Sequence, residues 1–272
     1  MSNDSMRLNR YLALCGLGSR RSCDELIKNG QIKVNGNTCT DPATQIGDHD
    51  SVKFGKKLVE PNDLTTVVLN KPRNYVCTKS DEKDRPTVYD LLPNALQHLN
   101  HVGRLDADSE GLLILTNDGD LSQSLTHPST KVEKEYLVTL NQAISQEELD
   151  KLLRGIHLPD LGRASAKAVL KVSPRRVRLI LTTGLKRQIR AMLGAIGFRV
   201  VKLVRLRVGS IWLSDLAVGN SAELTGREIA LLRSNPPLDK EFRDKPLKKV
   251  AKRPAKKAAL KRPKRGPKPG HR

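Results

Sequence analysis

The stretch His101–Asp120, HVGRLDADSEGLLILTNDGD, constrains the fold most, because two apolar segments enclose a short charged one. The run Leu112–Leu115 is apolar throughout and is followed by Asn117-Asp118-Gly119, which predicts a buried strand closed by a turn. The charged segment is then a tight turn between two strands. Its charged residues are Arg104, Asp106, Asp108 and Glu110. A carboxylate in such a turn can take part in chemistry, although an ordinary turn aspartate has the same surroundings.

Strand and helix patterns alternate irregularly along the rest of the chain. Alternating apolar residues predict strands at 134–140, 164–172, 177–181 and 200–208, and Ser145 with Glu148 predicts a capped helix start. In the last of these strands we expect Lys202, Arg205 and Arg207 to lie on one face, away from the core. No regular β-α-β alternation appears, so the sequence predicts an α+β fold with a mainly antiparallel mixed sheet.

Residues 5–60 form a compact pattern of their own. Two short helices are expected on either side of Gly16–Gly18, with Ser19 capping the second, and a strand then leads into an Asn35-Gly36 hairpin turn. Basic residues gather on this helix pair and strand: Arg7, Arg10, Arg20, Arg21, Lys28 and Lys33. Because basic side chains at a helix start are unfavourable for the helix dipole, we expect a phosphate or another anion to bind there.

The positive charge is concentrated at the C-terminal end. The chain of 272 residues has a net charge of +20, and thirteen Lys and Arg but no acidic residue lie between Lys245 and Arg272. Without these thirteen, 36 of the 49 basic residues remain against 29 acidic ones, a net charge of +7. We expect residues 240–272 to be disordered, because they cannot bury enough apolar surface to fold, and to strengthen binding to nucleic acid.

Several classes of protein are disfavoured. No run approaches the ~20 apolar residues of a membrane span, and the first residues lack the apolar core of a secretory signal, so a cytoplasmic protein is expected. The four cysteines form no CxxC pair and the six histidines no ligand spacing, so we expect neither a metal site nor a disulfide framework. No glycine-rich nucleotide motif is present, and no cofactor is expected.

Two resemblances follow from these segments. Residues 5–60, with RLNRYLALCGLGSRR and LIKNGQIKVNG, resemble an S4 domain of the αL type, which binds structured RNA. Residues 64–235 resemble the catalytic domain of bacterial ribosomal RNA pseudouridine synthases of the RsuA/RluB/RluF type. Four motifs carry this second resemblance through their order and spacing: Leu69-Asn-Lys-Pro72, Gly103-Arg-Leu-Asp106, Lys134-Glu-Tyr136 and Gly184-Leu-Lys-Arg-Gln-Ile-Arg190.

The resemblance implies a reaction that isomerises a uridine of ribosomal RNA in place. The N1–C1′ bond breaks, the uracil turns while it is bound, and C5 bonds to C1′, with no cofactor. Asp106 is implied as the catalytic carboxylate. It would act either as the nucleophile or as the group that promotes a glycal-like intermediate, and the residues alone leave both routes open.

The resemblance also implies the surroundings of Asp106. Tyr136 would stack on the flipped uracil, and Ile189 would complete the apolar wall of the pocket. Arg190 would be the cation that keeps Asp106 ionised. Arg104 would contact a phosphate or take the place of the flipped base, and we interpret the two other carboxylates of the turn as turn residues. Leu185 and Ala191 depart from the family pattern, in which these positions are commonly basic.

The sequence also bears on which ribosomal RNA is the substrate. Arg85-Pro-Thr-Val88, Asp90 and the basic tail resemble the members that act on the large subunit, which implies a 23S rRNA stem-loop near the peptidyl transferase centre, in ribosome precursor particles. The 16S rRNA is the alternative target. A non-catalytic S4-domain RNA-binding or ribosome-assembly factor is the alternative function, and a monomer is the default assembly.

Overall fold

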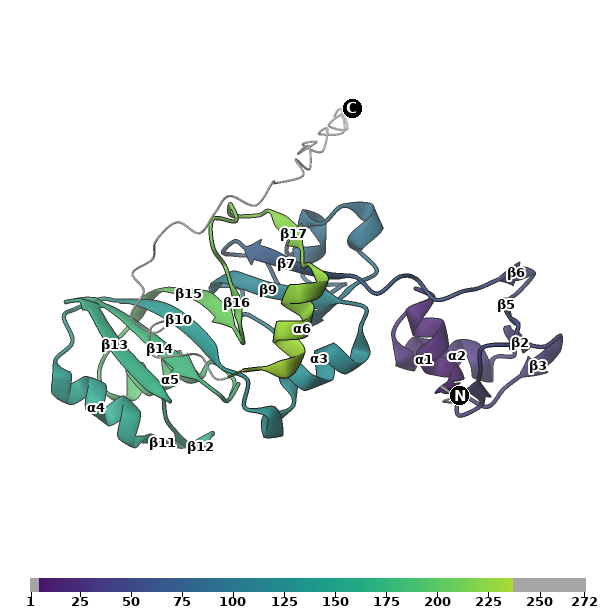
Figure 1. The fold of residues 1–272 in the computed structure, drawn as a ribbon. Helices are drawn as coiled ribbons and strands as arrows, with labels where there is room; N and C mark the ends of the chain where they lie inside the picture. Colours follow the sequence, from purple (N-terminus) through teal and green to yellow (C-terminus); the bar gives the residue numbers. More distant parts are fainter. Residues whose placement is uncertain (1–4, 237–272) are drawn as a thin grey trace, which may run out of the picture.

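The computed structural model describes residues 5–236, and the predicted disordered tail 240–272 lies outside them. Figure 1 shows a small N-terminal domain joined to a larger one. In the small domain, two helices pack on short strands through Leu8, Leu12, Ile27 and Ile32, and Ser19 caps the second helix as predicted. Its elements are β1 (Met6–Arg7), α1 (Leu8–Leu14), α2 (Arg20–Lys28), β2 (Ile32–Val34), β3 (Asn37–Cys39), β4 (Gln45–Ile46), β5 (Val52–Phe54) and β6 (Lys57–Leu58).

The large domain is built on one nine-stranded sheet in the order β13-β14-β10-β15-β9-β7-β17, with β16 beside β15 and β8 beside β9. The β9–β15 pair is parallel, and the other pairs of this sheet within residues 5–236 are antiparallel. This confirms the predicted α+β class. The strands are β7 (Thr66–Lys71), β8 (Asn100–Val102), β9 (Glu110–Thr116), β10 (Lys134–Leu140), β13 (Ala168–Ser173), β14 (Arg176–Leu181), β15 (Val200–Val208), β16 (Ile211–Trp212) and β17 (Ser221–Glu223).

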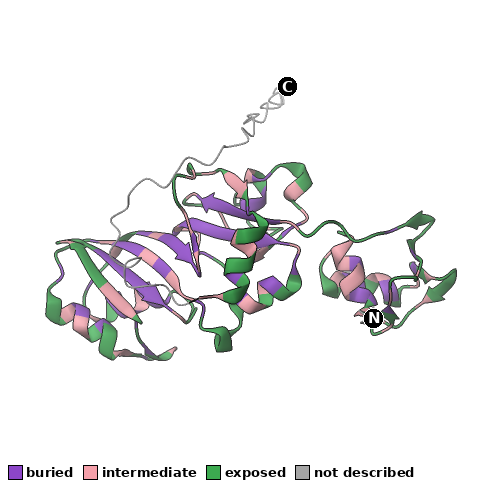
Figure 2. Ribbon diagram, viewed as in Figure 1, coloured by how far each residue is buried: buried purple, intermediate pink, exposed green. Residues whose placement is uncertain are grey.

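The two halves of the sheet are covered by helices in different ways. Around β7 and β9, the short 3₁₀ helices η1 (Val88–Leu91) and η2 (Asn94–Leu96) lie on one face, and α3 (Gly119–Thr126) and α6 (Gly226–Ser234) lie on the other. Both faces of β9 are therefore buried (Figure 2), which explains its unbroken apolar run. Around β10 and β14, α4 (Gln146–Arg154) and α5 (Gln188–Ala195) pack on the strands and form a separate hydrophobic core.

Several local predictions are tested by this arrangement. The capping box of Ser145 and Glu148 is formed at the start of α4, as predicted. The strand predicted at 164–172 is divided instead: β12 (Gly162–Ala164) pairs with β11 (Ile156–Leu158), and β13 begins at Ala168. The break occurs because the Ala166 N–H donates to the Leu152 carbonyl at 2.9 Å, which turns the chain toward α4. No helix within residues 5–236 is long and apolar enough to cross a membrane.

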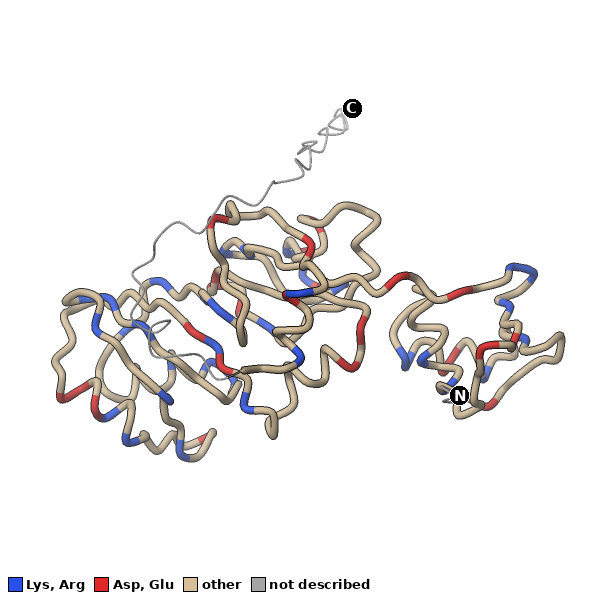
Figure 3. Tube along the Cα trace, in the orientation of Figure 1, with Lys and Arg blue, Asp and Glu red and all other residues tan. Residues whose placement is uncertain are grey.

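The charges of β15 are placed differently from the prediction. Lys202 is exposed, but Arg205 and Arg207 are only 3% and 1% exposed. Arg207 pairs with Glu133 at 2.9 Å and with Glu135 at 3.1 Å, so acidic and basic segments lie side by side within the sheet (Figure 3). Buried charges require such partners. Glu133 directly precedes β10 and Glu135 lies in it, far away in sequence, so the alternation within β15 could not reveal the partners of Arg207.

The two halves of the sheet meet where β9 runs beside β15. Gly111 lies opposite Arg205 there, with a φ of +103°. A Cβ atom at Gly111 would lie 2.8 Å from the backbone nitrogen of Arg205 and closer still to its carbonyl oxygen. The Arg205 Nε also donates to the Leu112 carbonyl at 2.7 Å. The close approach of the strands therefore depends on glycine at this position.

A short connection holds the two domains together. The side chain of Asn62 donates to the Leu14 carbonyl at 3.1 Å, and the side chain of Asn117 donates to the Asp63 carbonyl at 2.9 Å. Arg10 of α1 forms an ion pair of 2.6 Å with Asp120 of α3. The connection is thus bonded to both domains.

We expect Gly111→Ala to lower the free energy of unfolding of the large domain by at least about 2 kcal/mol. The added Cβ meets the backbone of Arg205 and leaves a non-glycine residue at positive φ. The measurement is urea unfolding followed by fluorescence of Trp212, which lies in the large domain and is the single tryptophan. Gly119→Ala is the control, since its Cβ meets nothing within 4 Å at the start of α3. Equal midpoints for both variants would contradict this account of the junction.

Candidate active site

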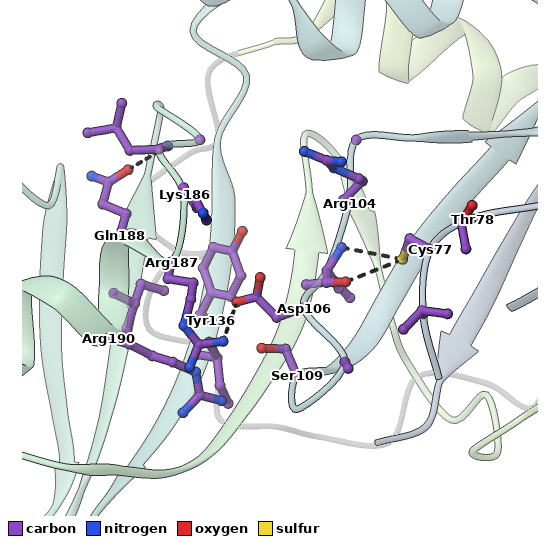
Figure 4. Close-up of a pocket in the computed structure, with 18 of the residues that line it drawn as sticks. Cys77, Thr78, Arg104, Asp106, Ser109, Tyr136, Lys186, Arg187, Gln188 and Arg190 are labelled. Atoms are coloured by element: carbon purple, nitrogen blue, oxygen red, sulfur yellow. Dashed lines mark hydrogen bonds and ion pairs between the residues drawn. The ribbon is translucent and has the colours of Figure 1, made fainter. Parts of the chain in front are cut away.

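A cavity of about 800 Å³ lies where the two halves of the large domain meet. One wall comes from the loop after β7, and the opposite wall comes from the loop between β14 and α5 and from the start of α5. The turn between β8 and β9 lies between them. The five residues implied by the resemblance all line this cavity: Arg104, Asp106, Tyr136, Ile189 and Arg190. Figure 4 shows Asp106 facing the Tyr136 ring across the cavity.

A buried lysine holds the turn that carries Asp106. The Lys71 side chain is fully buried at the end of β7, and its Nζ donates to the carbonyls of Asp106 at 3.1 Å and of Ser109 at 2.7 Å. It also approaches the carbonyls of Pro72 at 3.1 Å and Ala107 at 3.4 Å. Burial lowers the pKa of Lys71, and acidic groups nearby, among them Asp106, partly offset this. Lys71 therefore fixes the backbone of the turn from behind and leaves the carboxylate free to face the cavity.

The Asp106 turn has further backbone contacts. The Ser109 N–H donates to the Asp106 carbonyl at 3.0 Å, and the Asn74 N–H donates to the Ala107 carbonyl at 2.7 Å. Farther along the same loop after β7, Cys77 Sγ lies 3.4 Å from the Leu105 carbonyl and 3.5 Å from the Leu105 N–H (Figure 4). The turn is consequently bonded to the β7 loop on both sides.

Two arginines face the two aspartates of the turn. Arg187 donates to both oxygens of Asp108, at 3.2 and 3.3 Å, and its Nη1 lies 3.5 Å from an oxygen of Asp106. Arg190 pairs with the Asp108 carboxylate at 3.1 Å. Burial raises the pKa of Asp108, but the hydrogen bond from Arg187 and the charges of both arginines outweigh it, so the pKa lies below its ordinary value. Asp108 stays ionised as the centre of this cluster.

These contacts correct two expectations. The direct carboxylate partner of Arg190 is Asp108, whereas the cation in contact with Asp106 is Arg187. Asp108 and Glu110 are also more than turn residues, because Asp108 binds both arginines and Glu110 lies in β9, where it pairs with Lys202 at 3.1 Å. The sequence places these groups on separate elements, and only the fold brings them together.

Gln188 shapes the loop that presents Arg187. Its buried side-chain oxygen accepts hydrogen bonds from the Thr183 hydroxyl at 2.9 Å and the Leu185 N–H at 3.3 Å. Its amide nitrogen donates to the Ser165 carbonyl at 3.4 Å. Arg187, directly before α5, has a φ of +51°, in the left-handed region that non-glycine residues rarely adopt. The loop is therefore held in a conformation that it would not adopt by itself.

The remaining predicted residues differ in exposure. Ile189 is 5% exposed on α5 and packs with the core beneath the cavity, while Tyr136 is half-buried on β10. Arg190 is 14% exposed in its side chain and donates to the carbonyls of Asp108 and Val200 at 3.1 and 3.2 Å. Arg104 is exposed on the turn. The cavity thus combines one apolar and aromatic wall with a central carboxylate and an exposed arginine.

The basic residues of the small domain lie outside this cavity. Arg7, Arg20, Arg21, Lys28 and Lys33 are exposed, as expected for contacts with an anion. Arg10 differs, because it is partly buried and paired with Asp120 of the large domain. Arg20 lies 3.5 Å from the side-chain oxygen of Asn9.

The arrangement suits acid–base or nucleophilic chemistry on a flat, partly apolar ring held beside Asp106. Within residues 5–236 no group of three or more His, Cys, Asp or Glu could hold a metal ion. Sequence reasoning missed the roles of Lys71, Asp108, Arg187 and Gln188. All four lie within or beside the quoted motifs, but no local pattern indicates which carbonyls or carboxylates they contact.

Comparison with known proteins gives two family matches. Residues 65–195 match the model described as RNA pseudouridylate synthase, and residues 6–52 match the S4 domain. Among relatives, the ribosomal large subunit pseudouridine synthase B of Bacillus subtilis is 36% identical over 233 residues, which are 84% of this chain and 96% of the relative.

Two further proteins are similar over most of the chain. The dual-specificity RNA pseudouridine synthase RluF of Escherichia coli is 37% identical over 233 residues, 84% of this chain and 79% of that protein. A crystal structure of a pseudouridylate synthase superimposes with a TM-score of 0.62 at 31% identity, and covers 84% of this chain and all of that one.

We expect Lys71→Met to destabilise the large domain by about 2 kcal/mol, because it leaves buried carbonyls without their charged donor. Amide hydrogen exchange within 105–110 should accelerate more than exchange in α3 or α6. Lys151→Met is the control, since Lys151 is exposed on α4 in an ion pair with Glu147, and such pairs contribute about 0–1 kcal/mol. Unchanged exchange within 105–110 would show that Lys71 does not hold the turn.

Proposed function

The chain belongs to the RNA pseudouridylate synthase family, and on this basis we propose that it converts a specific uridine of ribosomal RNA into pseudouridine with Asp106 as its catalytic carboxylate. The observation that carries the proposal is the position of Asp106. It faces an aromatic wall across a cavity of about 800 Å³ and is fixed from behind by Lys71. A flipped base fits such a site, because it needs a flat apolar surface and a reactive group beside the sugar.

Asp106 acts on the ribose of the flipped nucleotide. As a nucleophile it attacks C1′ and displaces N1, so that an Asp106–C1′ ester forms as the N1–C1′ bond breaks. As a base it removes the C2′ proton while the N1–C1′ bond breaks, and a glycal-like intermediate forms. In either case the uracil turns in the cavity and C5 bonds to C1′; the Asp106–C1′ bond breaks in this step of the first route, and the proton returns to C2′ in the second. The proton from C5 leaves and N1 gains one, so the overall reaction is an isomerisation. No cofactor is part of this proposal.

The wall opposite Asp106 holds the uracil while it turns. Tyr136 stacks on the ring, and Ile189 and Leu203 form the apolar surface behind it. Arg190 keeps the neighbouring Asp108 ionised and adds positive potential near the reacting sugar. Arg104, exposed on the turn, enters the space that the flipped base leaves or contacts a phosphate of the RNA.

The proposed substrate is a 23S rRNA stem-loop in a precursor of the large ribosomal subunit. The name of the Bacillus subtilis relative, a ribosomal large subunit enzyme, supports this choice over 16S rRNA. The exposed arginines and lysines of the S4 domain bind the phosphates of the stem, together with the basic C-terminal residues. We further propose that the enzyme acts as a monomer in the cytoplasm.

We expect Asp106→Asn to abolish pseudouridine formation and to leave RNA affinity within about threefold of wild type, because the substitution keeps the size of the side chain but removes the reactive charge. A chemical pseudouridine map of rRNA from cells with and without the gene identifies the target. The same map with the variant then tests the residue. Identical maps with and without the gene would favour a non-catalytic RNA-binding factor, and a fully active variant would exclude Asp106 as the catalytic group.

We expect Arg20→Met combined with Arg21→Met to weaken RNA binding more at low salt than at high salt. The slope of log K against log salt is negative, and each lost phosphate contact should reduce its magnitude by about 0.7–0.9. Binding of the mapped stem-loop is measured by titration at several salt concentrations. Arg227→Met is the control, since Arg227 is exposed on α6 of the large domain and its substitution removes one positive charge outside the S4 domain. A slope identical to that of wild type would show that these two arginines do not contact phosphates.

A further inference from the structure

Four charged side chains at the Asp106 turn are paired with one another before any RNA is bound. Asp106 and Asp108 face Arg187 and Arg190, two negative and two positive charges. An RNA strand that enters the cavity adds the negative charge of its phosphates. Its binding therefore favours a cation that can exchange its present carboxylate partners for a phosphate.

The two arginines differ in how firmly they are held. Arg190 belongs to α5, is 14% exposed in its side chain and donates to two backbone carbonyls. The side chain of Arg187 is 46% exposed. Within residues 5–236 its hydrogen bonds and ion pairs go to the carboxylates of Asp106 and Asp108. Arg187 can therefore change partners without breaking a bond to the backbone.

The contact between Arg187 and Asp108 already has the geometry that a phosphate requires. Two nitrogens of the guanidinium group donate to two oxygens of one carboxylate, at 3.2 and 3.3 Å. The same planar fork binds two oxygens of a phosphate. Because exposed ion pairs contribute little net stability, a phosphate that approaches from solvent competes with these carboxylates at low cost.

The backbone at Arg187 indicates that its side chain is needed at this place. A φ of +51° is unfavourable for a residue with a side chain, and glycine or asparagine would adopt it more easily. The hydrogen bonds of Gln188 to Thr183 and Leu185 hold the loop in this conformation. Strained backbone that the surroundings maintain is typical of functional positions. Figure 4 shows the result, with the guanidinium group of Arg187 paired with Asp106.

We propose that Arg187 binds a phosphate adjoining the target uridine and that this exchange releases Asp106 from its ion pair. In the free enzyme Arg187 bridges both carboxylates and keeps Asp106 in an ion pair. When the nucleotide is in place, Arg187 moves to its phosphate, Arg190 stays on Asp108, and Asp106 faces the ribose without a direct cation. This inference rests on the proposed function and adds a residue that couples substrate binding to the activation of Asp106.

The test is a double-mutant cycle between Arg187 and a single phosphate. The probe is the stem-loop that carries the mapped uridine, synthesised with one neutral methylphosphonate at the position 5′ or 3′ of that uridine. Wild type, Arg187→Met, Arg187→Lys and the control Arg227→Met are compared for kcat/KM and for RNA affinity. Arg227 is an exposed arginine of α6, so its variant controls for the loss of one positive charge.

We expect one of the two methylphosphonates to lower kcat/KM of wild type and of Arg227→Met by about tenfold or more, the loss expected for a charged hydrogen bond. The same RNA should cause no further loss in Arg187→Met, and Arg187→Lys should lie between, because it keeps the charge without the fork. The inference is wrong if, at both positions, the methylphosphonate lowers kcat/KM of Arg187→Met by the same factor as it lowers kcat/KM of wild type.

The experiments distinguish failure of the proposed function from failure of the inference about Arg187. If the rRNA map shows no target, there is no isomerisation to explain, and the proposed function is wrong. Binding of oligouridylate with the same single methylphosphonates then decides whether Arg187 contacts a phosphate, by the same cycle on affinity. A cycle without coupling in that experiment would also overturn the inference about Arg187.

Discussion

The parallel contact between β9 and β15 is the constraint on which the site depends. It joins one half of the sheet, which carries the Asp106 turn, to the other half, which carries Tyr136 and α5. The contact requires Gly111, because any Cβ there would collide with the backbone of Arg205. A displacement of one half against the other would move Asp106 away from the wall that faces it. The glycine that follows the Asp106 turn is thus part of the geometry of the cavity.

Ion pairs of two kinds, buried and exposed, occur within the large domain. In the sheet, Glu135 and Arg207 are almost fully buried and pair with each other, so they belong to the structure. In the cavity, Asp106 and Arg187 are 37% and 46% exposed in their side chains and 3.5 Å apart, so their contact is open to solvent. The buried pairs are expensive to break, whereas the cavity pair exchanges readily. This difference allows a rigid sheet to carry a site whose ion pairs rearrange.

Much of the fold could be predicted from local sequence patterns, because strand burial and helix capping depend largely on residues that are close together in the chain. The apolar run of β9, the Ser19 cap and the capping box of Ser145 all describe contacts within a few residues of chain. The buried arginines of β15 could not be predicted, since Arg207 pairs with Glu135 of β10 and Arg205 donates to a carbonyl of β9, and both strands are far away in sequence. The same limit applies to the site: the motifs located Asp106, while the contact of Arg187 with it exists only after β9 and α5 come together.

Lys71 shows why a motif can be identified before its physical role is understood. Its place in Leu69-Asn-Lys-Pro72 supported the family resemblance, but a lysine at a strand end is usually solvated. Here the ammonium group is buried and bonded to carbonyls on both sides of Ala107 in the Asp106 turn. A neutral side chain of the same length could fill the space but could not attract several carbonyls to one point. The turn therefore needs a buried positive charge, although burial lowers the pKa of that lysine, and the carbonyl dipoles together with the nearby carboxylates make the charge tolerable.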